Sequence, residues 1–115
     1  MEEWLDRERV EARLPESAVP FHALTYDPDT GQYCASGGPF TGVSVIRRSD
    51  GQLQSVVHYV DGVAHGVSVA WSPGGQPEVY NEMEFGVCHG RHVKWGEGGS
   101  VVEDFRCHEG RTVGP

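Results

Sequence analysis

The sequence has few cysteines and no long apolar run. Its three cysteines, Cys34, Cys88 and Cys107, are odd in number and unevenly spaced, which argues against a disulfide framework and favours a reducing compartment. The uncharged apolar runs are far shorter than the roughly 18 residues that a membrane span needs. The acidic residues 1–6 do not resemble the start of a secretory signal. We therefore expect a cytoplasmic protein.

Basic residues are scarce as well. Nine lysines and arginines stand against 17 acidic residues, which gives a formal net charge of −8. A field of this sign repels phosphate groups and anionic lipids. It argues against nucleic acids and membranes as partners and favours a basic protein, or it serves solubility alone.

Glycine, in contrast, is abundant and periodic. The chain has 16 glycines in 115 residues, a length typical of one domain. Eleven of them recur every 24 residues, which indicates a repeat architecture. The three columns are Gly38, Gly62, Gly86 and Gly110; Gly42, Gly66, Gly90 and Gly114; and Gly51, Gly75 and Gly99.

Each repeat is predicted to be a β-hairpin. Residues 67–72 are rich in β-formers, residues 73–75 interrupt them, and residues 76–85 resume an extended pattern. A three-residue loop ending in Gly51 or Gly75 would place glycine where a left-handed residue is needed. We predict an all-β antiparallel meander of consecutive hairpins that forms one elongated, twisted sheet.

The even period predicts that one side-chain alternation holds throughout the repeats. Odd positions are mostly apolar and even positions mostly polar, so one face should be buried and the other wet. This assigns Val57, Val79, Met83 and Phe105 to the core and leaves Tyr80 on the wet face.

The N-terminal part differs from the repeats. Residues 2–14 are predicted to form a short, poorly anchored helix that Pro15 ends. The predicted organisation is an arm at 1–20 and a single repeat domain at 21–115. That domain divides into an imperfect hairpin at 21–41, around a turn at 27–31, and repeats at 42–65, 66–89 and 90–113.

The repeats resemble the MORN repeat, and more closely the variant found in bacterial toxin–antitoxin and immunity proteins. The resemblance rests on residues 50–53, 59–66 and 86–90, and on Tyr33 with residues 38–42 at the start of the array. It covers about residues 31–115. The third unit differs, because Gly98-Gly99 replaces Asp-Gly. The resemblance implies a protein that binds and neutralises a toxin.

Two chemical alternatives involve the cysteines. Cys88, His92 and Cys107 could contribute to a zinc site, but their spacing matches no zinc module that we recognise. His65 and His89 occupy a turn column, which favours a structural role. A thiolate–histidine pair at Cys88 or Cys107 is a second alternative, but no motif surrounds either cysteine. We predict no cofactor, no metal and no enzymatic activity.

A partner-binding site is predicted on the even positions of the repeats. Tyr80 would be an aromatic residue ringed by carboxylates, as interface hot spots often are, or simply a tyrosine packed over its sheet neighbours. Trp71 and Trp95, one repeat apart, are core residues or part of an apolar patch. The predicted partner-binding residues are Glu78, Tyr80, Glu82, Glu84, Asp104, Trp71 and Trp95.

The sequence therefore predicts an immunity protein or antitoxin that binds a basic toxin. The alternative is a repeat scaffold in an unrelated complex, and an enzyme is the third. The product of the neighbouring gene would separate the first two.

Overall fold

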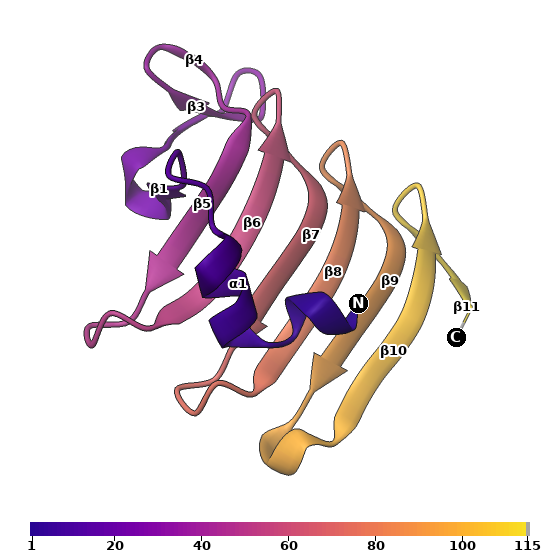
Figure 1. Cartoon of the computed structure of the whole chain (residues 1–115). Helices are drawn as coiled ribbons and strands as arrows, with labels where there is room; N and C mark the ends of the chain where they lie inside the picture. Colours follow the sequence, from indigo (N-terminus) through magenta and orange to yellow (C-terminus); the bar gives the residue numbers. More distant parts are fainter. Residues whose placement is uncertain (115) are drawn as a thin grey trace.

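The structure, a computed structural model, describes residues 1–114 and is mostly β (Figure 1). It confirms the meander of antiparallel hairpins and the short N-terminal helix. Helical turns are η1 (Glu2–Trp4), α1 (Arg7–Arg13), η2 (Phe21–Ala23) and η3 (Glu97–Gly99). An eight-stranded sheet contains, in spatial order, β1 (Val19–Pro20), β5 (Gly42–Arg47), β6 (Leu53–Val60), β7 (Val63–Trp71), β8 (Pro77–Glu84), β9 (Val87–Trp95), β10 (Val101–His108) and β11 (Arg111–Gly114). A second sheet contains β2 (Thr25–Asp27), β3 (Gln32–Ala35) and β4 (Gly38–Pro39).

The predicted three-residue loops are confirmed. Between β5 and β6, the Arg48 amide donates to the Gln52 carbonyl at 2.8 Å across residues 49–51, and Gly51 has a φ of 91°. Between β7 and β8, Gly75 takes the equivalent place with a φ of 87°. Only a residue tolerant of the left-handed region closes such a loop without strain, which explains this glycine column.

A β-bulge follows each of these two loops, and a third lies near the start of β10. The register of the pairs leaves Gln54, Glu78 and Val102 without a partner on the preceding strand, and these positions are 24 residues apart. One extra residue in one strand inverts the alternation of side chains beyond it. The single parity predicted for the repeats is therefore wrong. Beyond the bulges in β6, β8 and β10, even-numbered residues face the side that odd-numbered residues face on β5, β7 and β9. Val57, Val79, Met83 and Phe105, which were predicted to lie in the core, therefore point to the opposite face.

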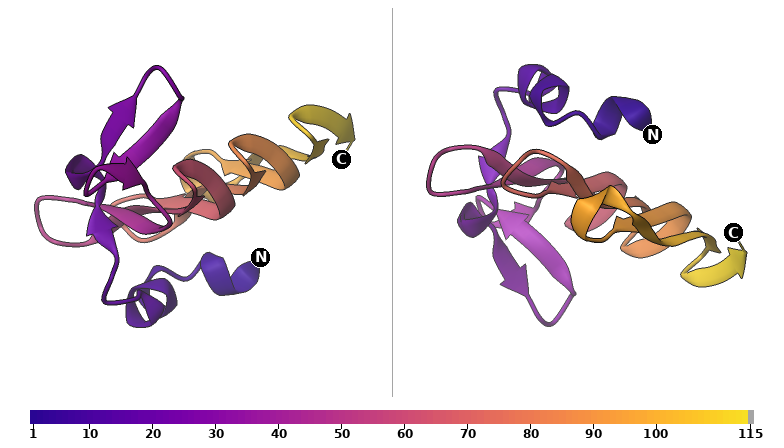
Figure 2. Two further views of the ribbon diagram at one scale, coloured as in Figure 1. Left: turned by 90° about the horizontal axis from the view of Figure 1, so that it is seen from above. Right: turned by 90° about the horizontal axis from the view of Figure 1, so that it is seen from below.

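The two N-terminal helical turns cover one face of the eight-stranded sheet, which we call the helix face (Figure 2). The strand register aligns Val45, Val56, Val69, Tyr80 and Val93 across this face. Most of the core of the molecule lies between this row and the N-terminal helices.

The N-terminal arm is firmly anchored, contrary to the prediction. Val10 of α1 is 1% exposed within the core cluster, and the Trp71 indole Nε1 donates to the Leu5 carbonyl at 2.8 Å. Asp6 caps α1 by accepting from two backbone amides, so the helical segment breaks there into η1 and α1. α1 ends at Arg13, before Pro15, as predicted.

Within residues 1–114, the opposite face is covered only near β5 and β6. There the three-stranded sheet brings Tyr33 and Phe40 to within 5.8 and 5.6 Å of the Tyr59 ring centroid, which explains the burial of Tyr59. The predicted turn between β2 and β3 is present. The hairpin belongs to a separate sheet, and η2 replaces the start of its first strand, so the prediction of one sheet is corrected.

Candidate functional site

The predicted anchor, Tyr80, is not on an exposed surface. Its side chain lies on the helix face, paired between Val69 and Val93, and is 1% exposed. The bulge at Glu78 causes this, because it reverses the alternation just before Tyr80. Tyr80 is therefore a core residue, and the prediction that it binds a partner is corrected.

Tyr80 also belongs to a small polar network. Its hydroxyl donates to Oε2 of Glu82 at 2.6 Å, and the Arg91 amide donates to Oε1 of the same carboxylate at 2.8 Å. Burial, and then the adjacent carboxylate, raise the pKa of Tyr80 well above its usual range. Burial alone would raise the pKa of Glu82, but these two hydrogen bonds hold it below its ordinary value. The arrangement stabilises β8 against β9.

The other predicted acids are dispersed. Glu78 is exposed at its bulge, and Glu84 lies 3.3 Å from Nε2 of His89. Asp104 is on the helix face, where the Arg91 guanidinium donates to it at 3.1 and 3.3 Å. That hydrogen-bonded ion pair lowers the pKa of Asp104. The predicted acidic surface is therefore partly neutralised.

The two tryptophans have different environments. Trp71 is 0% exposed in the core cluster, so it is not available to a partner. Trp95 is half-buried at the end of β9, beside Val101. Only Trp95 of this pair presents part of its ring to solvent.

The prediction that the cysteines form no disulfide is wrong. Cys88 of β9 and Cys107 of β10 form a disulfide with 5.7 Å between their Cα atoms, and Cys34 is free. The His92 imidazole meets Asn81 and lies 2.9 Å from Oε1 of Glu103. Within residues 1–114, no group of three or more histidine, cysteine, aspartate or glutamate side chains is placed to hold a metal ion.

A different surface stands out at the edge formed by the two-residue turns. Asp61-Gly62, Phe85-Gly86 and Glu109-Gly110 all have positive φ at both positions, as type I′ turns require. These turns recur every 24 residues and lie along one edge of the sheet (Figure 1). The amides of Gly86 and Gly110 donate to carbonyls of the neighbouring hairpin at 2.7 and 2.8 Å, so the edge is continuous.

A second column of residues fixes these turns. The Phe85 amide donates to Nδ1 of His65 at 3.2 Å, and the Glu109 amide donates to Nδ1 of His89 at 3.1 Å. In the same column, the Thr41 hydroxyl accepts a hydrogen bond from the Asp61 amide of the first turn at 2.9 Å. The histidines have the structural role that the sequence favoured, because each satisfies an amide that the turn leaves unpaired.

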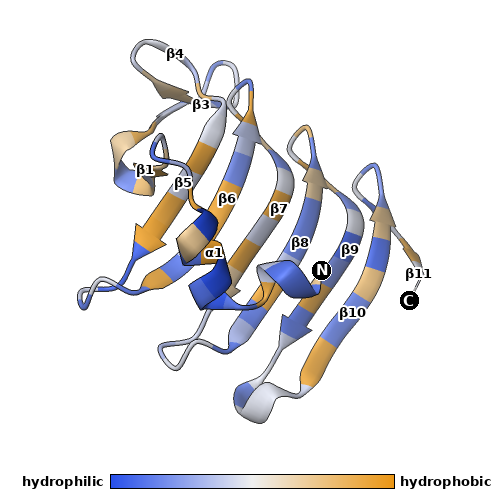
Figure 3. Ribbon diagram, viewed as in Figure 1, coloured by the Kyte–Doolittle hydropathy of each residue, from blue (hydrophilic) through white to orange (hydrophobic). Residues whose placement is uncertain are grey.

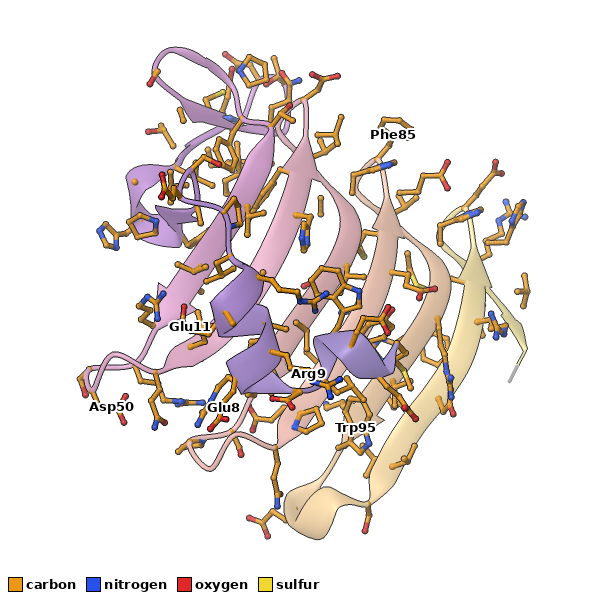
Figure 4. All side chains as sticks on the ribbon, in the orientation of Figure 1. Glu8, Arg9, Glu11, Asp50, Phe85 and Trp95 are labelled. Atoms are coloured by element: carbon orange, nitrogen blue, oxygen red, sulfur yellow. A yellow bond between two sulfur atoms is a disulfide. The ribbon has the colours of Figure 1, made fainter. Side chains whose placement is uncertain are left out.

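Phe85 is the exception on this edge. Aspartate and glutamate hold the equivalent positions, whereas Phe85 is an aromatic side chain with a φ of 46°. Its side chain is 62% exposed and projects from the turn between β8 and β9 (Figure 4). Val87 beside it is 44% exposed. A left-handed conformation costs a bulky residue roughly 1–2 kcal/mol. The Phe85 ring lies 4.6 Å from the His65 ring, centroid to centroid, which offsets part of this cost and leaves most of the ring exposed.

We call this region the Phe85 surface: Phe85 and Val87 together with the carboxylates of Asp61, Glu84 and Glu109. It combines an aromatic residue with surrounding acids, the pattern that the sequence placed at Tyr80. The signal was present in the sequence, because position 85 departs from the acidic residues at positions 61 and 109 of its column.

Comparisons with protein-family models, curated proteins and solved structures found no match. No helix within residues 1–114 is long and apolar enough to cross a membrane.

Proposed function

We propose that this chain is an immunity protein or antitoxin that neutralises a basic toxin by direct binding, and that the Phe85 surface makes the central contact. The observation that carries the proposal is an exposed aromatic ring held in a left-handed turn among carboxylates. Costly conformations that persist at exposed positions are concentrated at functional sites.

Two further observations support the proposal. The net charge of −8 would steer a basic protein towards this chain. The 24-residue hairpin unit resembles the MORN variant of bacterial immunity proteins. The proposal assigns the chain no catalytic step. A cytoplasmic location is part of the proposal, but the Cys88–Cys107 disulfide argues against a reducing compartment, so binding should be measured with this pair both oxidised and reduced.

The test uses the purified product of the neighbouring gene, with binding kinetics measured on the wild type and on Phe85→Asn. Asparagine tolerates the left-handed region, so this variant should be more stable by about 1 kcal/mol. Loss of a hot-spot aromatic should weaken binding roughly 30-fold, chiefly through faster dissociation. Stability and binding would then move in opposite directions.

Val102→Asn is the matched control, because Val102 is 57% exposed at the other edge of the sheet. It should bind like the wild type. Asp61→Asn with Glu109→Gln should slow association and flatten its dependence on salt. Equal binding by Phe85→Asn and the wild type would exclude this surface. Binding without loss of toxicity would favour the scaffold alternative.

A further inference from the structure

A cavity of about 690 Å³ lies at the β5 edge of the sheet, between that strand and the segment that links α1 to η2. Its wall is mainly apolar and includes Leu14, Ala18, Phe21, Val45 and Ile46. Phe21 and Ile46 are 36% and 39% exposed, so the cavity opens to solvent. A space of this size is typical of ligand sites and is large enough for an apolar side chain.

The cavity lies beside an open strand edge. β1 pairs in parallel with β5 only at Ser44 and Val45. Beyond these two residues, Ile46 and Arg47 have a neighbouring strand on the β6 side only, within the described part of the chain. An exposed sheet edge offers backbone donors and acceptors to an incoming extended segment.

The charge next to the cavity is negative. At its rim, Arg47 donates to both carboxylate oxygens of Glu11, at 2.6 and 2.9 Å, so these two charges cancel. Beyond this pair lies a second hollow of about 450 Å³, whose lining includes Glu8 and Asp50 (Figure 4). Both carboxylates are exposed and form no ion pair among residues 1–114. Arg7, the cation in this lining, donates instead to the Ser72 and Pro73 carbonyls.

We propose that the β5 edge binds an extended peptide segment of a partner protein. The segment adds a strand beside Ile46 and Arg47, places one apolar side chain in the 690 Å³ cavity, and places a lysine or arginine beside Glu8 and Asp50. Backbone pairing provides affinity, and the cavity and the carboxylates provide specificity. The site lies on a different edge of the sheet from the Phe85 surface, so it does not depend on the proposed function.

The test uses three capped heptapeptides with threonine and valine at most positions. The first has a central leucine and a lysine at each end; the second replaces the leucine with serine; the third replaces both lysines with glutamate. Binding to the full chain is measured by calorimetry, and amide exchange is followed by NMR. The first peptide should bind at least tenfold more tightly than the other two. It should slow exchange of the Arg47 amide, which faces the open edge because the next amide, that of Arg48, bonds to Gln52 on the β6 side.

Two variants test the location. Ile46→Ser should weaken binding of the first peptide about fivefold, and Glu8→Gln with Asp50→Asn should weaken it by a similar factor. Val113→Ser, at the opposite edge where Val113 is 62% exposed, and Phe85→Asn should both bind like the wild type. Retained folding is checked by circular dichroism, since all five substitutions in these four variants are at exposed positions.

The proposal would be overturned if no peptide binds, if the three peptides bind equally, or if protection appears at β11 rather than β5. It would also be overturned by a stable dimer in sedimentation runs without peptide that Ile46→Ser dissociates, because a second copy would then be the occupant.

Discussion

At one end of the eight-stranded sheet, α1 and η1 lie over β5–β8 (Figure 1); at the other end, no element in the described chain covers β10 and β11 (Figure 2). Hydrophobic residues are denser along β5–β7 than along β8 and β9 (Figure 3). The first end holds the buried cluster around Val10 and Trp71, whereas Val93 and Cys107 are the buried hydrophobic residues of the last three strands. The first end therefore buries apolar side chains beneath the helical turns, whereas the other end buries few and has a disulfide between two of its strands.

Removing the centre of the covered end should have the largest effect. Trp71→Ala deletes a fully buried ring and its bond to Leu5, and should cost about 3–5 kcal/mol in urea unfolding. The control is Trp95→Ala, which removes a half-buried ring at the other end. Equal losses in the two variants would show that the helix does not concentrate stability at β5–β7.

Breaking the disulfide tests the uncovered end. Replacing Cys88 and Cys107 together with alanine opens a link across 19 residues and should cost roughly 3 kcal/mol. Hydrogen exchange should accelerate most for amides of β10 and β11 and least for those of β5–β7. Uniform acceleration across the sheet would mean that the two ends unfold as one unit.

The network of Tyr80, Glu82 and the Arg91 amide, which lies between the two ends of the sheet, should contribute less to the free energy of unfolding. Tyr80→Phe keeps the ring and removes the hydroxyl that bonds to Glu82, and should cost about 1 kcal/mol. The pKa of Glu82, followed by NMR, should rise because one of its two donors is lost. Tyr26→Phe, at a residue 52% exposed, is the control and should change neither quantity.

The exposed ion pair at the covered end should have the smallest effect. The hydrogen bonds from Arg47 lower the pKa of Glu11, so the pair stabilises the fold above the ordinary glutamate pKa of about 4.3. That contribution should be lost as the pH falls through the lower pKa of the folded state. Arg47→Gln should remove it, by less than about 1 kcal/mol at neutral pH. A difference between variant and wild type that persists at pH 2 would point to lost packing instead.

The repeat, the three-residue loops and the hairpin meander could be read from the glycine columns, because each glycine meets a local backbone requirement. Which face of the sheet each side chain occupies could not be read from the glycine columns. The bulges at Gln54, Glu78 and Val102 reverse the alternation, and those positions carry no residue type in common.

The same reversal explains why the predicted site was misplaced. Tyr80 was assigned to the wet face by counting residues across the bulge. The glycine columns identify the turns but say nothing of the residue before each glycine, so the exposure of Phe85 does not follow from the repeat. The anchoring of the N-terminal arm depends on distant pairs such as Leu5 with Trp71, and four apolar side chains in a short helix gave no indication of them.

The bulges also determine how such a chain can lengthen or shorten. Within each unit the bulge inverts the alternation once, and the two-residue turn that follows inverts it again, so successive units begin alike. Duplicating or deleting 24 residues would therefore add or remove a hairpin without moving any other side chain to the wrong face. Deleting Glu78 alone would remove the bulge and leave Val79 and Tyr80 on their present faces, because Pro77, Val79 and Tyr80 would then alternate regularly opposite Trp71, Ala70 and Val69. Evolution of this fold should thus tolerate changes of whole units, and tolerate single-residue insertions and deletions in the strands only at the bulges.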